Sequence, residues 1–81
     1  MDDKHYIEAA KKMIINRFIE IKAQPNHMIM SADLFNVRAK CTNPKTANSF
    51  DAAINELKEE GIIYGSGLGI HLTQEGYDRI W

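Results

Sequence analysis

The sequence predicts one α+β domain in which helices pack around a small β-hairpin. Segments 4–22 and 44–60 carry apolar residues at spacings of three and four, the pattern of a helix with one buried face. Two runs rich in β-forming residues, 62–64 and 69–72, flank a glycine-rich turn, which is typical of a hairpin. Because 81 residues suffice for one small core, we expect residues 1–81 to form a single domain.

Composition and charge exclude several classes of protein. Apolar residues make up 44% and charged residues 26% of the chain, which excludes a disordered protein. A single cysteine, Cys41, excludes an internal disulfide framework and fits a reducing compartment. No apolar run approaches the roughly 20 residues that span a bilayer, and the acidic N-terminus does not resemble a signal peptide. We therefore expect a cytoplasmic protein that has no membrane partner, no cofactor and no small-molecule ligand.

The first helix is expected to begin at a cap formed by Asp2 or Asp3 and to end just before Pro25. Its buried face is predicted to comprise Ile7, Ala10, Ile14, Phe18 and Ile21. Its charged residues are predicted to lie mostly on the solvated side: Lys4, Glu8, Lys11, Lys12, Arg17 and Lys22.

A short extended segment, 27–30, leads into a second helix for which Ser31 is the predicted N-cap. Asp33 lies in its first turn, where negative charge complements the helix dipole. After a polar turn, Asn43 and Pro44 are typical of a helix start, and that helix is expected to continue to about Glu60.

Gly61 is the expected stop of this helix, and the glycines of residues 65–69 are expected to supply positive φ angles in the hairpin turn. Thr73 is the predicted cap of a last short helix, in which Gly76 indicates a close approach of backbones. The predicted core comprises Ile14, Phe18, Leu34, Phe50, Ile54, Leu57, Ile62, Ile70 and Leu72.

Three stretches carry a resemblance to a known superfamily. Residues 53–63 resemble the end of a recognition helix running into a β-hairpin wing. Residues 70–76 are similar to a leucine-threonine-x-x-glycine exit from that wing, and residues 31–34 resemble the start of a second helix. The chain thus resembles the winged helix-turn-helix superfamily over nearly its whole length. This resemblance implies a three-helix core, a small hairpin wing, a short C-terminal helix and a bacterial or phage transcriptional regulator that reads DNA with residues 44–60.

The distribution of charge favours the same function. No acidic residue lies between Asp33 and Asp51, so this stretch has a charge of +3 and the rest of the chain −4. Arg38 and Lys40 are predicted to hold phosphates, and Lys45 and Asn48 suit base edges. The full set of predicted DNA contacts is Arg38, Lys40, Lys45, Thr46, Asn48 and Ser49. The alternative interpretation is a solvated polar helix with capping residues, whose acids Asp51, Glu56 and Glu59 would repel a phosphate backbone.

A protein-interaction module without DNA binding is the second hypothesis. The hairpin turn carries no charge, and Tyr6, Tyr77 and Trp81 on the terminal helices are aromatic residues of the kind enriched at interfaces. The alternative interpretation is that Tyr77 and Trp81 close the core against the first helix. A homodimer through the terminal helices is compatible with both functions, because it would place two recognition helices on one face of the DNA.

An enzyme is not expected. His5, His27 and His71 are scattered without metal-ligand spacing, and no partner for nucleophilic chemistry can be named for Cys41. The glycines of residues 65–69 lie inside a hairpin and do not open a helix, so they lack the context of a phosphate-binding loop.

Overall fold

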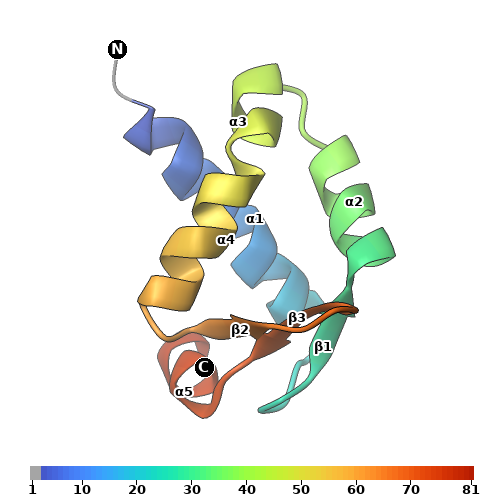
Figure 1. Cartoon of the computed structure of the whole chain (residues 1–81), viewed down its shortest axis with the longest axis vertical. Coiled ribbons are helices and arrows are strands. Elements are labelled where there is room, and N and C mark those ends of the chain that lie inside the picture. The colour runs from blue at the N-terminus through green and yellow to red at the C-terminus, as the bar shows by residue number, and fades with distance from the viewer. Residues whose placement is uncertain (1–2) are drawn as a thin grey trace.

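The computed structural model describes residues 3–81, which form an α+β fold of five helices and a three-stranded antiparallel sheet (Figure 1). In Figure 1 helices α1 to α4 lie above the sheet, and α5 lies below it. The elements in chain order are α1 (Lys4–Glu20), β1 (Met28–Met30), α2 (Ser31–Ala39), α3 (Pro44–Asn48), α4 (Phe50–Glu59), β2 (Ile63–Gly65), β3 (Gly69–Leu72) and α5 (Gln74–Ile80).

The sheet has the strand order β1-β3-β2, and its register places two apolar pairs on its inner face. Ile29 lies opposite Ile70, and Ile63 lies opposite Leu72; all four side chains are buried. Since successive side chains of a strand point to opposite faces, His71 lies on the outer face. This confirms the predicted hairpin and the predicted inward direction of Ile70 and Leu72.

The core lies between α1, α4 and the inner face of the sheet. Ile14 and Phe18 of α1 and Leu57 of α4 are completely buried. Seven of the nine predicted core residues are buried, whereas Leu34 and Ile54 are only partly buried and pack against the core from its edge. The buried apolar residues outside the predicted core are Ala10, Ala23, Ile29, Val37, Ala53 and Ile63, of which Ala10 belongs to the predicted apolar face of the first helix.

Two predicted helix boundaries are wrong. Helix α1 ends at Glu20, well before Pro25, because Lys22 adopts a left-handed conformation (φ 53°) that no helix continues. The N-cap of α2 is Met30, which has extended backbone, and Ser31 is already the first helical residue. The Ser31 hydroxyl donates instead to the carbonyl of Leu68 in the hairpin turn (3.1 Å). Asp3 stands at the N-cap of α1 without a side-chain cap bond, and Asp2 lies outside the described residues.

The helix predicted over residues 44–60 is broken at Ser49 into α3 and α4. The Ser49 hydroxyl donates to the Lys45 carbonyl (2.8 Å), and its backbone N–H donates to the Thr46 carbonyl (3.0 Å). A serine that bonds back to the preceding turn competes with regular helical bonding, which accounts for the break. The predicted start at Asn43 and Pro44 is confirmed: the Asn43 side chain accepts a bond from the Lys45 N–H (2.9 Å).

Lys11 was predicted on the solvated side of the first helix, but the structure buries it (7% exposed) between α1 and α4. Its ammonium group lies 2.8 Å from Glu60, 3.2 Å from Glu56 and 3.4 Å from Glu8. Burial alone lowers the pKa of Lys11, but the three carboxylates outweigh that effect and raise it above its ordinary value. A charge is therefore tolerated at this helix contact because acidic partners surround it.

The glycines do not all act as predicted. Gly61 has a positive φ (77°) and ends α4 as expected, whereas the hairpin glycines have no positive φ. Gly69 is required instead because there is no room for a side chain: a Cβ there would collide with the carbonyl of Ile29 on the neighbouring strand. Thr73 caps α5 as predicted, by accepting a bond from the Gly76 N–H (2.8 Å).

Substitution of Gly76 is expected to destabilise the fold. A Cβ at this position would collide with the carbonyl of Ile62 and lie 2.9 Å from the Leu72 side chain, as the predicted close approach requires. We expect Gly76→Ala to lower the free energy of unfolding by about 1–3 kcal/mol in urea titrations. Gly67→Ala is the matched control, because nothing lies within 4 Å of its added methyl group. Equal stability of the two variants would contradict the close packing of α5.

Replacement of Lys11 tests the ion network. Lys11→Met removes the shared partner of three glutamates while keeping an unbranched side chain of similar length. We expect a loss of about 1.5–3 kcal/mol in the free energy of unfolding, the range for hydrogen bonds to charged groups. Lys12→Met, at an exposed position of the same helix, should change it by less than about 0.5 kcal/mol. A negligible effect of Lys11→Met would show that the carboxylates contribute nothing to this contact.

Candidate functional site

The segment predicted to touch DNA is the end of α2, the turn over residues 40–43 and α3. Arg38, Lys40, Lys45 and Asn48 are exposed there, as a surface contact requires. Thr46 is buried (8% exposed), so its predicted role as a contact residue is wrong. Ser49 is half-buried and its hydroxyl is bonded to the Lys45 carbonyl, so its place is structural.

The structure does not bring the three basic residues onto one face. Arg38 lines a groove between α2 and α4. Lys40 lies on the side of the turn that faces α1, and the Lys45 ammonium group lies over the ring of Tyr6 in α1, 5.5 Å from its centroid. A cation over an aromatic face is attracted by the ring. Lys40 and Lys45 therefore flank the exposed turn on its α1 side, and Arg38 is separate from them.

Some of the acidic residues near this segment form ion pairs with basic residues outside it. Arg17 of α1 binds Asp33 of α2 through two parallel bonds, Nε to Oδ1 and Nη2 to Oδ2, both 3.0 Å long. Glu56 is held by Lys11, away from the turn. Asp51, however, is exposed and lines the same groove as Arg38. Repulsion of a phosphate backbone by α4 is thus expected at Asp51.

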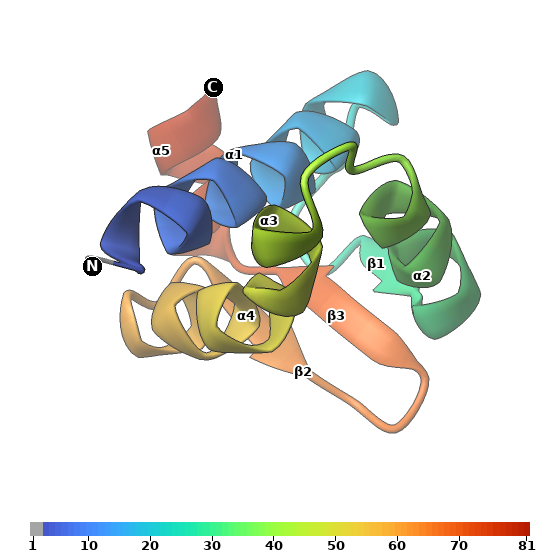
Figure 2. The same ribbon diagram turned by 90° about the horizontal axis from the view of Figure 1, so that it is seen from above.

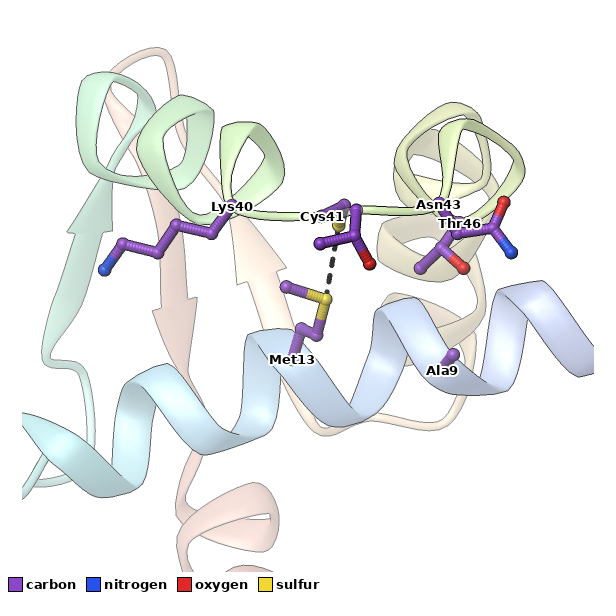
Figure 3. Close-up of a pocket in the computed structure, with 7 residues that line it drawn as sticks. Ala9, Met13, Lys40, Cys41, Asn43 and Thr46 are labelled. Atoms are coloured by element: carbon purple, nitrogen blue, oxygen red, sulfur yellow. Dashed lines mark hydrogen bonds between the residues drawn. The ribbon is translucent and has the colours of Figure 1, made fainter.

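A hollow of about 280 Å³ lies between α1, the turn and α3 (Figure 3). Its walls include Ala9 and Met13 of α1, Cys41 in the turn, and Asn43 and Thr46 at α3. The Cys41 thiol donates to the Met13 sulfur (3.3 Å), and the Lys40 side chain points away from this sulfur pair (Figure 3). Burial raises the pKa of the Cys41 thiol, and the charge of Arg38 offsets this only in part. The thiol is therefore protonated at neutral pH, which is the opposite of what a nucleophile needs.

The three predicted interface aromatics occupy different surroundings. Tyr6 lies near the start of α1, where it contacts His5 edge-on and the Lys45 ammonium group. Tyr77 is half-buried and packs against the core, while Trp81 after α5 is 58% exposed. The start of α1 and α5 lie at opposite ends of the long axis (Figure 1). Tyr6 and Trp81 consequently do not belong to one surface.

A polar network on the outer face of the sheet was not predicted. The rings of Tyr64 and His71 are stacked with centroids 4.6 Å apart, and they lie opposite each other in the β2–β3 register. The His71 ring nitrogens lie 3.1 Å from the Asn26 carbonyl and 3.0 Å from the Ser66 hydroxyl. Once the register is known, strand alternation alone places both rings on this face. The network joins the hairpin to the loop before β1.

Two further observations concern the described residues as a whole. Among residues 3–81, no group of three or more His, Cys, Asp or Glu side chains is placed to hold a metal ion. None of the helices in that range is long and apolar enough to cross a membrane.

The reactivity of Cys41 tests its surroundings. Because its pKa is raised in the folded state, the thiolate is disfavoured and iodoacetamide should react more slowly with the native chain than with the chain unfolded in urea. The alkylation rate should rise with pH along a curve displaced to higher pH than that of the unfolded chain, whose thiol titrates at about 8.5. A native rate equal to or faster than the unfolded rate at about pH 8 would contradict a protonated, half-buried thiol.

Comparison of the chain with protein-family models, curated proteins and solved structures gives no match. The exposed turn with Lys40, Lys45 and Asn48, and the groove beside Arg38, are two surfaces suited to binding a partner.

Proposed function

We propose that this chain is a winged helix-turn-helix domain that binds duplex DNA through the turn and α3. The order of helices and strands, with β1-β3-β2 as the strand order and α2, α3 and α4 preceding the hairpin, supports this interpretation of the α+β fold. The Ser49 break divides the predicted recognition helix, so its N-terminal half corresponds to α3. A similar fold alone does not establish DNA binding, so the surface residues must also suit a DNA contact.

The observation that carries the proposal is the exposed cationic turn. No acidic residue occurs in residues 34–50, and Lys40 and Lys45 flank the exposed residues 42–43. Lysines at such a position neutralise phosphates, and the exposed amide of Asn48 suits the paired donor and acceptor of adenine. Asp51 and Glu59 on the exposed side of α4 would repel the phosphates. Contact is therefore restricted to the turn and α3, with α4 held back from the groove.

Protein docking without DNA is the second candidate function. The hairpin turn, residues 65–69, carries no charged side chain, so it offers no cation to a second DNA groove. Its most exposed large side chain is the apolar Leu68 (65% exposed). An apolar, uncharged hairpin tip suits a protein surface better than a phosphate backbone.

Charge reversal in the turn tests the DNA proposal. Lys40→Glu/Lys45→Glu should abolish binding to duplex DNA in a low-salt fluorescence-anisotropy titration, because each lysine is proposed to neutralise a phosphate. For the wild-type chain the logarithm of affinity should fall linearly with the logarithm of salt concentration, as counterions are released. The matched control, Lys12→Glu/Lys58→Glu, makes the same change in net charge at exposed positions outside the turn. It should weaken binding far less.

Two results would overturn this assignment. One is an equal loss of affinity in both double variants, which would show that DNA binding depends only on the net charge of the chain. The other is a wild-type chain that binds no duplex at low salt, and this result would favour protein docking. Circular dichroism of each variant establishes that the fold is intact.

A further inference from the structure

An apolar groove between α2 and α4 is not used by the proposed DNA contact. Helix α2 packs on α1 and the sheet, and α4 packs on α1 and β2, so the two helices diverge (Figure 2). The space between them has a volume of about 170 Å³. Leu34 of α2 and Phe50 and Ile54 of α4 are its apolar lining.

The rim of this groove exposes more apolar surface. Phe35 of α2 lines the groove and is 66% exposed. Leu68 at the hairpin tip is 65% exposed and is held beside the first turn of α2, because its carbonyl accepts bonds from the Ser31 N–H (2.9 Å) and hydroxyl (3.1 Å). Large apolar side chains gathered around an apolar groove mark an interaction site.

The rim also carries one charge of each sign. Arg38 lies on the α2 wall and Asp51 on the α4 wall. Within the part of the chain that the structure describes, neither forms an ion pair; the salt bridges there involve Lys11, Arg17 and Arg79 instead. The groove therefore carries opposite charges on its two walls.

These features fit a second copy of the same chain. A two-fold interface uses one patch twice, so that patch must be complementary to itself. Here the patch holds both an exposed ring, Phe35, and an apolar hollow. A cavity of about 150 Å³ lined by similar side chains accommodates a benzene ring. With Arg38 on one wall and Asp51 on the other, a two-fold axis across the groove also allows Arg38 of each copy to pair with Asp51 of the other.

We propose that two copies of the chain associate through this groove, with Phe35 of each copy seated between α2 and α4 of the other. This interface differs from a dimer through the terminal helices, since it does not involve Tyr77 or Trp81. It is also independent of the proposed DNA contact, because Lys40 and Lys45 lie on the α1 side of the turn. Failure of DNA binding would leave it untouched.

Sedimentation equilibrium of the whole chain, without DNA and from low-micromolar to near-millimolar concentration, tests the proposal. The wild-type chain should show a reversible monomer–dimer equilibrium. Phe35→Ala should weaken association by at least about 30-fold, the effect of truncating a central aromatic anchor. Trp81→Ala is the matched control, because it removes an aromatic ring of similar exposure elsewhere and should leave the dimer unchanged.

A charge swap provides the sharper criterion. Arg38→Asp and Asp51→Arg should each weaken the dimer, because each places like charges across the two-fold axis. The double variant Arg38→Asp/Asp51→Arg restores opposite charges and should recover most of the wild-type affinity. Both residues are exposed, so the variants should remain folded, which thermal unfolding checks.

Three results would overturn the proposal. The first is a wild-type chain that stays monomeric throughout the concentration range. The second is a dimer lost in Trp81→Ala but kept in Phe35→Ala, which would place the interface at the terminal helices. The third is a double variant no tighter than either single variant, which would show that Arg38 and Asp51 do not meet.

Discussion

The close contact between α1 and α4 is the constraint on which the rest of the structure depends. Ala10 and Ala53 are completely buried, and small side chains at such positions let two helices approach closely. Ile14 and Leu57 fill the remaining space, and Lys11 closes the edge with carboxylates from both helices. Because α4 leads through Gly61 directly into β2, the position of this helix pair also sets where the sheet begins.

Helix α2 packs against α1 and runs in a different direction from α4. Its Val37 is buried, and the paired bonds between Arg17 and Asp33 tie it to α1. The groove beside Phe35 is a consequence of this arrangement. The same arrangement separates Arg38 from Lys40. Arg38, at the end of α2, lies toward α4, whereas Lys40, in the turn, lies toward α1. Two surfaces of different chemistry thus arise from one short stretch of chain.

Local rules predicted much of the fold, and tertiary geometry decided the rest. Asn43 with Pro44, Gly61 and Thr73 act through neighbours in the sequence, so their roles could be inferred from the sequence alone. The burial of Lys11 could not, because Glu56 and Glu60 lie more than forty residues away in the chain. Thr46 shows the same limit for the candidate site: its type suits DNA, but its position on α3 turns it toward α1. The groove depends on how two helices diverge, and no residue pattern reports that divergence.

The close contact at Gly69 limits how this fold can vary. A Cβ at this position would meet the backbone of Ile29 and Met30, so the first residue of β3 is restricted to glycine wherever this sheet is kept. Gly67, two residues earlier, faces open space. A side chain is therefore accommodated at Gly67 without moving β3 against β1. The hairpin tip is thus a position where this small domain accepts a residue of different size or charge, whether through evolution or by design.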